Sequence, residues 1–420
     1  MNDESRGAEP AAGGESRRAV HRGCEPRTGA DQDAPRQPES GPHVRVDPQD
    51  SLDAGARQGR GVRDGMNDPT IRPDPRSAAI PRYARFATPF LNDPRDAVFV
   101  ALMMQCGSVA LAGVGLYFVG PLFWWLAPLY LALLFVGVID RFTLMLHCTS
   151  HRQLFRPGYR VLNQIIPWVL CPFMGQTPET YFAHHVGMHH VEENRPGDLS
   201  STERFQRDRI GHWLRYWGRF MTAGLFDLIR YFARNGRRRL LRRVIVGEAS
   251  YWIAMALLLR VDPRATFVVF LLPYLTMRTL MMAGNWAQHA FICPEQPGHP
   301  LRASITCVGT RYNRRCFNDG YHAVHHVVPR CHWTEHPAEF ERHLEEYGRN
   351  DAVVLRGVDF FQVWLLLMSG NWDRLARAFV RLPGAPERTH EEAIAFLRTR
   401  VRPIITSAVP LAARPVASGA

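Results

Sequence analysis

Two pairs of long apolar runs constrain the fold of this 420-residue chain more than any other feature. Val98–Val119 and Leu122–Ile139 are separated only by a Gly-Pro pair, and Val244–Leu259 and Ala265–Ala283 only by a five-residue polar turn. Each run approaches the roughly 20 residues with which a helix crosses a bilayer. Because such short turns join neighbouring antiparallel helices, we expect two transmembrane hairpins, with spans at about 98–119, 122–146, 244–259 and 265–289.

The distribution of arginine predicts which way these hairpins face. The stretch 191–243 between the pairs carries thirteen Arg against six acidic residues, whereas the two short turns carry two Arg between them. Positive charge is retained on the cytoplasmic side of a membrane. We therefore expect an all-α integral membrane protein with four transmembrane helices in two hairpins, both termini in the cytoplasm, and a helical cytosolic cap.

The segments outside the hairpins differ in composition. Residues 1–65 contain no Ile, Phe, Trp or Tyr, so they form either a disordered regulatory tail or an over-extended start ahead of Met66. Pro167 and Pro172 interrupt the apolar stretch 161–175, which favours an interfacial or re-entrant helix over a span. We divide the rest into a cytosolic N-terminal segment (66–96), a membrane domain (97–350), amphipathic C-terminal helices on the membrane (351–401) and a loose tail (402–420).

Charge and cysteine content bear on the class of protein. All 51 basic residues are Arg, and the net charge of +12 would also suit a nucleic-acid binder. Because the arginines cluster beside hydrophobic spans, we attribute the charge to a membrane and not to nucleic acid. The absence of Lys is typical of high-G+C coding and favours a bacterial source, hence a bacterial cytoplasmic membrane. The eight cysteines form no C-x-x-C pair, which predicts reduced thiols.

Nine of the eighteen histidines fall into four constellations beside or between the predicted spans. The patterns are H-x-x-x-H, H-x-x-x-H-H, a single histidine at the end of the fourth span, and H-x-x-H-H. Imidazole is the commonest protein ligand of Zn, Cu, Fe and Ni, and nine imidazoles exceed what one ion uses. The candidate metal ligands are therefore His147, His151, His185, His189, His190, His289, His322, His325 and His326.

Helical spacing predicts how these ligands are shared. Positions three or four apart lie on one helix face, so each of the three clusters can present imidazoles to a shared centre, His185 together with His189 among them. His190 is rotated about 100° from His189 and would reach a second centre. A lone H-x-x-x-H is more often incidental, but three clusters in one chain indicate a two-metal site. His184 is a spare or outer group, and we expect ordinary surface or core roles for His212, His299, His332, His336 and His343.

The order of these clusters over two hairpins resembles that of the membrane fatty acid desaturases. The resemblance covers about residues 95–345, and the sequence at 184–190 and 318–322 is similar to that of bacterial members. It implies two irons held by the nine histidines, with His289 as the ninth ligand and Asn285 holding a metal-bound water. Three residues separate the first two histidines, as in relatives that act on lipid-linked acyl chains. The second cluster has one residue more than the usual H-x-x-H-H, and the third begins with His and not Gln.

The resemblance implies an O₂-dependent enzyme that introduces a double bond into a lipid-linked fatty acyl chain. An alkyl C–H bond has no acidic proton, so its cleavage calls for a redox-active metal such as iron. Nothing in the sequence matches the H-P-G-G motif of a fused cytochrome b5 domain, so we expect electrons from a separate, ferredoxin-like donor. Outer carboxylates and amides tune such centres; the candidates are Asn285 and Asp319, with Glu179 and Asp198, unless these acids pair with Arg.

Two groups of charged residues allow two interpretations each. Asp140 and Arg141 lie inside the second span, either as functional intramembrane charges or as a pair at the cytosolic interface. The basic cluster after residue 236 binds anionic lipid headgroups or docks an acidic electron donor. Its members are Arg237, Arg238, Arg239, Arg242 and Arg243.

Other functions fit parts of the pattern. A di-iron hydroxylase or ketolase acting on an acyl chain or a carotenoid would begin with the same hydrogen abstraction, so this alternative stays open. A membrane metal transporter would place its ligands near mid-bilayer, whereas these histidines lie at cytoplasmic span ends or in the cap. A zinc hydrolase would usually show H-E-x-x-H, which the sequence lacks.

Overall fold

A computed structural model describes residues 80–404 of the chain. The tail or start-site interpretation of residues 1–65, the first part of the segment 66–96 and the end of the loose tail lie outside the described residues. Two short 3₁₀ segments, η1 (Arg82–Phe90) and η2 (Pro94–Asp96), lead into the first hairpin. The functional division of the chain into domains stays a prediction.

The first hairpin is built from α2 and a second, longer helix that bends. Helix α2 (Ala97–Gly115) is followed by a turn at η3 (Gly120–Leu122), where Gly120 has φ +52°. The return helix comprises α3 (Phe123–Ala132), the π-helical segment η4 (Leu133–Val138) and α4 (Ile139–His151). Pro94–Gly115 and Gly120–His151 are long and apolar enough to cross a membrane.

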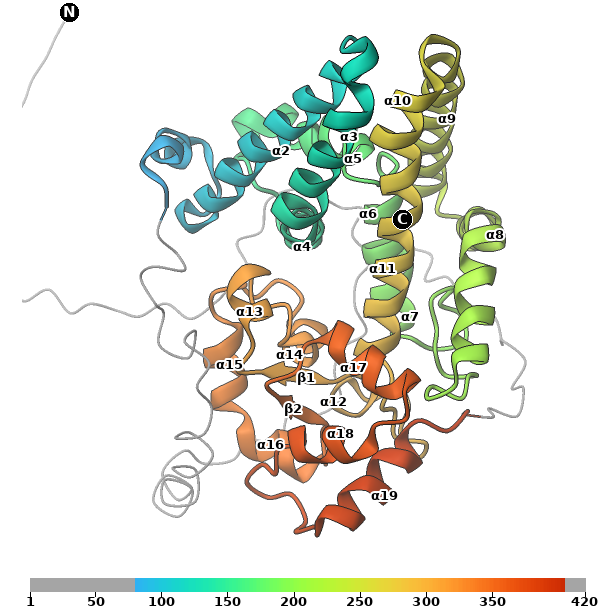
Figure 1. The fold of residues 1–420 in the computed structure, drawn as a ribbon. Coiled ribbons are helices and arrows are strands. Elements are labelled where there is room, and N and C mark those ends of the chain that lie inside the picture. Colours follow the sequence, from blue (N-terminus) through green and yellow to red (C-terminus); the bar gives the residue numbers. More distant parts are fainter. Residues whose placement is uncertain (1–79, 405–420) are drawn as a thin grey trace, which may run out of the picture. The chain divides into compact units, whose positions relative to one another are not determined.

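The second hairpin has the same plan. Helix α9 (Arg238–Val261) is joined to α10 (Pro263–Thr266), the π-helical segment η8 (Phe267–Leu271) and α11 (Leu272–Gln288). Asp262 forms the turn, because its side chain accepts from the backbone N–H groups of Arg264 and Ala265. Arg238–Val261 and Pro263–Gln288 complete the four candidate spans of the described residues, which confirms the all-α fold with two hairpins (Figure 1).

The region between the hairpins is helical rather than an open polar loop. It comprises η5 (Pro157–Gln164), η6 (Ile166–Leu170), α5 (Cys171–Phe173), α6 (Thr180–His184), η7 (His185–His189), α7 (His190–Glu192) and α8 (Ile210–Arg234). Helix α8 is amphipathic: Trp213, Tyr216 and Phe220 are buried at helical spacing. The arginines of its other face obscure this pattern in the sequence.

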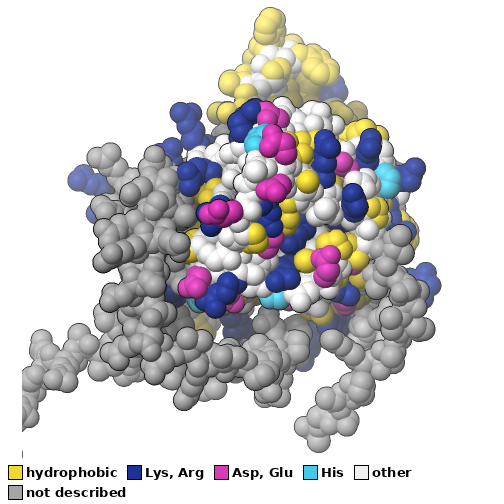
Figure 2. Space-filling view, turned by 90° about the horizontal axis from the view of Figure 1, so that it is seen from below, with side chains coloured by type: hydrophobic (Ala, Val, Ile, Leu, Met, Phe, Trp, Pro, Cys, Tyr) yellow, Lys and Arg dark blue, Asp and Glu magenta, His cyan; other side chains and the backbone are white. Residues whose placement is uncertain are grey.

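The cap follows α11 and ends the described chain. Its helices are α12 (Pro300–Ala303), α13 (Arg311–Arg315), α14 (His322–Val327), α15 (His336–Arg342), α16 (Leu344–Arg349), α17 (Phe360–Met368), α18 (Trp372–Ala378) and α19 (His390–Arg400). Two short parallel strands, β1 (Thr306–Val308) and β2 (Val354–Arg356), pair Thr306 with Val354. From below, the surface mixes arginine and acidic side chains, whereas the fainter projection beyond it is mostly hydrophobic (Figure 2).

Helix α17 packs against α11, with Val363 and Leu367 fully buried. Its opposite face remains open, since Phe361 and Leu365 are exposed. This helix therefore rests on the protein along one side, and contact of its other side with a membrane stays a prediction. The seven cysteines in the described part of the chain are all free thiols.

Candidate metal centre

The nine predicted ligands converge into two groups at the junction of hairpins and cap. Within each group, the candidate ligand atoms all lie within 4.8 Å of one another. The five-histidine group consists of His147, His151, His185, His190 and His325. The four-histidine group consists of His189, His289, His322 and His326.

The five-histidine group joins three elements. Helix α4 supplies His147 and His151 from the end of the second span, the η7–α7 segment supplies His185 and His190, and α14 supplies His325. Their Nε2 atoms face one another. The separations are 2.8 Å for His147–His325, 2.9 Å for both His151–His185 and His190–His325, and 3.2 Å for His185–His190.

The four-histidine group replaces α4 with α11. His289 follows the last turn of α11, His189 comes from η7, and His322 and His326 lie one turn apart on α14. The Nε2 of His322 lies 3.3 Å from that of His289 and 3.1 Å from that of His326. All four side chains are buried.

These separations fit bound metal ions. Imidazole nitrogens bind metals at about 2.0–2.1 Å, so two neighbouring ligands of one octahedral ion lie about 3 Å apart. The Nε2 separations of 2.8–3.2 Å in the five-histidine group and of 3.1–3.3 Å in the four-histidine group match that spacing. Neutral imidazoles offer one N–H each and cannot satisfy so many facing nitrogens among themselves. The donor set is all nitrogen, which suits Fe, Cu, Ni or Zn and disfavours Mg or Ca.

A π-helical turn determines which of the two groups each histidine of the second cluster (His185, His189 and His190) faces. We expected His185 and His189 to face one centre and His190 the other, but His185 and His190 face the same group and His189 faces the other. The reason is that η7 (His185–His189) is π-helical, which brings residues five apart onto one face. The third cluster also divides, with His325 facing one group while His322 and His326 face the other.

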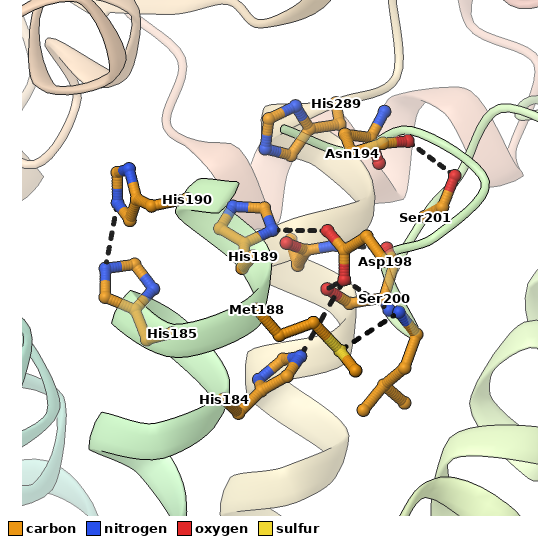
Figure 3. A network of polar contacts seen from close by, with 12 residues as sticks. His184, His185, Met188, His189, His190, Asn194, Asp198, Ser200, Ser201 and His289 are labelled. Carbon is orange, nitrogen blue, oxygen red and sulfur yellow. Dashed lines mark hydrogen bonds and ion pairs between the residues drawn. The ribbon is translucent and has the colours of Figure 1, made fainter. Parts of the chain in front are cut away.

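Buried acceptors orient the rings through their Nδ1 atoms. His189 Nδ1 lies 2.6 Å from Asp198 Oδ2, and Asp198 also accepts from the backbone N–H and hydroxyl of Ser200 (Figure 3). His289 Nδ1 donates to the carbonyl of Ala303 at 2.9 Å, and His147 Nδ1 lies 3.3 Å from Asp319. Such partners fix the tautomer that leaves Nε2 free to bind a metal.

Burial favours the neutral form of six ligand rings outside the spans. It lowers the pKa of His289 to about 3, an effect that the nearby His189 reinforces. Burial and neighbouring histidines also hold the pKa of five further rings well below the ordinary value; these are His185, His190, His322, His325 and His326. A neutral imidazole presents a lone pair, which is the form that binds metal.

The segment that carries η7 is anchored to the second hairpin. Glu248 of α9 is buried and accepts from the hydroxyls of Thr177 and Thr180 at 2.5 and 2.8 Å. Gly247 lets this approach happen, because a Cβ there would lie 2.0 Å from the carbonyl oxygen of Pro178. The start of α6, and with it the second histidine cluster, is thereby held against α9.

The remaining candidates lie in different places. Asn285 donates to the Ser200 carbonyl and the Tyr216 hydroxyl, so its expected role in holding a metal-bound water stays a prediction. Glu179 does not contact the histidines; it accepts from Trp168 and pairs with Arg243. His184 lies 3.9 Å from Asp198, in an outer position.

The side chains of Asp140 and Arg141 in the second span bind partners in other elements and not each other. Asp140 pairs with Arg315 of the cap, and the Arg141 guanidinium donates to Gln105. The basic cluster lies at the start of α9, where Arg237 donates to the Gly187 carbonyl. Arg238 and Arg242 are exposed.

Sequence reasoning missed Thr202 and Arg207, which hold the loop around His289. The Thr202 hydroxyl donates to the His289 carbonyl at 2.7 Å. Arg207 is fully buried and donates to carbonyls of Ala290, of loop 202–205, and of Arg400 and Arg402. Neither residue belongs to a motif, because their contacts are long-range.

A protein-family model for fatty acid desaturases matches residues 130–356. The matched range contains all nine histidines of the two groups. Comparisons with curated proteins and with solved structures gave no match.

Proposed function

The chain belongs to the fatty acid desaturase family, and we propose that it is an O₂-dependent di-iron desaturase of lipid-linked fatty acyl chains. The observation that carries the proposal is the pair of all-histidine groups between the cap and the four apolar helices. His147, His151, His185, His190 and His325 would hold one iron, and His189, His289, His322 and His326 the other. When bound, iron supplies the redox chemistry that activates O₂ and breaks an alkyl C–H bond.

The proposed reaction balances only with an external reductant. A –CH₂–CH₂– unit loses two hydrogens and becomes –CH=CH–, while O₂ takes these two, two electrons and two protons, and leaves as two waters. The two electrons come from a separate ferredoxin-like donor. In this scheme the chain's own residues keep the imidazoles neutral, hold their Nε2 atoms inward and exclude bulk water from the buried four-histidine group.

We further propose that the cap and both termini lie on the cytoplasmic side of a bacterial membrane. The support is the arginine-rich region between the hairpins, which follows the rule that positive charge stays inside. Arg238 and Arg242 at the start of α9 then lie at the headgroup level, where they would contact anionic lipid or an acidic donor.

Expression in a host that lacks desaturases tests the proposal. We expect new double bonds in the membrane lipids, located by gas chromatography and mass spectrometry of derivatised fatty acid esters. A matched strain that expresses His289→Ala should produce none. Hydroxylated or ketone products would replace the desaturase assignment with the hydroxylase or ketolase alternative.

Metal analysis tests the centre itself. The purified chain should contain about two irons, as the two groups require. One zinc and no iron per chain would contradict the proposal.

A further inference from the structure

His336 is a buried histidine whose ring nitrogens lack hydrogen-bond partners in the described part of the chain. It begins α15 and is only 6% exposed. The carbonyls of Asn318 and Cys331 lie near the ring, but carbonyls only accept and cannot serve the nitrogen that carries the lone pair. Burying an unpartnered polar group is costly, so such a group calls for an explanation. We expected an ordinary surface or core role for this residue; it lies in the core, and its ring nitrogens are unpartnered there.

The ring of His336 borders a cavity of about 30 Å³ that reaches the five-histidine group. His147, His151 and His325 line the same cavity, and the ring centroids of His325 and His336 are 6.3 Å apart. A single water needs roughly 10–15 Å³ of such space, so the cavity has room for about two small molecules.

Most other polar groups of the wall already have protein partners. Asp96 accepts from His332 at 3.0 Å and from Trp333 at 3.1 Å, and Asp319 accepts from Tyr312 at 2.7 Å. The rest of the wall is largely apolar, with Phe99, Phe317 and Leu144 among its residues. A small polar molecule in this cavity would therefore find His336 on one side and the five-histidine group on the other.

We propose that this cavity is a binding site for a small polar ligand, water in the resting protein, which His336 positions beside the five-histidine group. The inference rests on the proposed function, because it takes that group to hold iron. Burial lowers the pKa of His336 to about 4, so its ring is neutral at pH 7 and offers one donor and one acceptor. Water both donates and accepts, which matches that ring.

The proposed ligand site lies beside the five-histidine group and not beside the four-histidine group. The cavity that borders His289 and His326 of the four-histidine group measures only about 10 Å³, which is at the lower limit for a single water. Exogenous small ligands should therefore bind at the five-histidine side, where His336 contacts them. His336 is a positioning residue, since it acts on the ligand and not on the acyl chain.

Azide titration of the iron-loaded, full-length protein tests the inference. Azide is a small anion that would take the place of water, and its binding to oxidised iron is followed by visible absorption. His336→Phe keeps an aromatic ring but removes the donor, so we expect azide to bind about tenfold more weakly or worse. His336→Gln keeps an N–H donor and should stay within about threefold of the wild type. His343→Phe, which changes a histidine outside the cavity, is the matched control.

The outcomes separate this inference from the proposed function. Unchanged azide affinity in His336→Phe would overturn the inference while leaving the di-iron assignment intact. Loss of iron from His336→Phe would also overturn it, because the residue would then support the metal directly. If His336→Phe fails to fold, His336→Leu replaces it with the same expected loss of azide affinity. A wild-type chain without iron would instead remove the proposed function, and this inference with it.

Discussion

The two histidine groups share two elements of the chain but differ in how firmly the protein surrounds them. The η7–α7 segment and α14 contribute to both groups, whereas α4 serves only the five-histidine group and α11 only the four-histidine group. In the four-histidine group all side chains are buried, and both His189 and His289 have Nδ1 acceptors. In the five-histidine group His151 and His190 are partly exposed, and three of its members border the larger cavity.

This difference indicates a division of roles. A group with few ligands depends more strongly on the position of each one, and outer hydrogen bonds set the position and basicity of an imidazole. Such bonds hold two of the four rings, those of His189 and His289, whereas the Nδ1 of His322 has no partner among the described residues. A group with five ligands can be less enclosed and still hold its metal, which leaves room for small molecules beside it. We therefore propose that the four-histidine group favours retention of its metal, and that the five-histidine group favours exchange of small ligands.

The largest expected effect comes from removing one ligand on each side. His289→Ala leaves three ligands in its group, so we expect iron to fall from about two to about one per chain. His151→Ala leaves four, and at saturating iron it should keep nearly two. Both variants should lose desaturation, since the proposed chemistry needs both irons. Iron is measured by mass spectrometry of the purified chain. Greater iron loss from His151→Ala than from His289→Ala would reverse the comparison.

Arg207→Gln should be the next most damaging change. Its guanidinium donates to the carbonyl of Ala290, which follows His289 in the chain. It also donates to the carbonyls of Arg400 and Arg402 near the end of the described residues. Leaving several buried carbonyls unpaired should cost about 3 kcal/mol or more in the free energy of unfolding. Thermal unfolding in detergent measures the loss, and residues 400–404 should become sensitive to protease. Arg152→Gln, a partly exposed arginine paired with Asp93 at the five-histidine side, should cost less than 1 kcal/mol.

The sequence predicts much of this centre because its main signals are local. Apolar run length predicts four spans, and histidine spacing selects eight of the nine residues that the structure brings together. The ninth, His289, has no partner at helical spacing and was expected as a ligand from the family resemblance. The division of those residues between two groups was predicted incorrectly, since it depends on the π-helical turn at 185–189, which ordinary helix spacing does not reveal. His336 and Arg207 could not be identified either, because their contacts join parts of the chain that lie far apart in sequence. His336 borders a cavity that it shares with His147 and His151, and Arg207 bonds to the carbonyl of Arg400.

A smaller effect should distinguish the outer carboxylates. Burial alone would raise the pKa of the Asp198 carboxyl, but His189, which lies within hydrogen-bond distance at 2.6 Å, and the nearby His184 hold it well below its ordinary value. Asp198→Asn removes that charge, and the iron affinity of the four-histidine group should fall by about 10- to 100-fold. Asp319→Asn, whose contact with His147 is longer at 3.3 Å, should change affinity less. Competition with a chelator measures both.

The lowered pKa of Asp198 also predicts how the stability of the protein depends on pH. Asp198 stays charged in the folded chain to lower pH than in the unfolded chain. Its stabilising contribution is therefore complete above the ordinary Asp pKa near 3.9 and is lost as pH falls through the lower folded value. In acid, wild type and Asp198→Asn should approach the same stability. A constant difference between them at all pH values would contradict this account.

The smallest expected effect concerns a single hydroxyl. Thr202→Val keeps the shape of the side chain but removes its bond to the His289 carbonyl, which should cost about 1 kcal/mol in the free energy of unfolding. Thr149→Val is its counterpart near the five-histidine group, where the hydroxyl bonds only within α4, to Met145 and Leu146. That change should cost less than about 0.5 kcal/mol. Since both substitutions delete the same atoms, a larger loss from Thr149→Val would show that the protein supports the five-histidine side more firmly, which is the reverse of what the hydrogen bonds indicate.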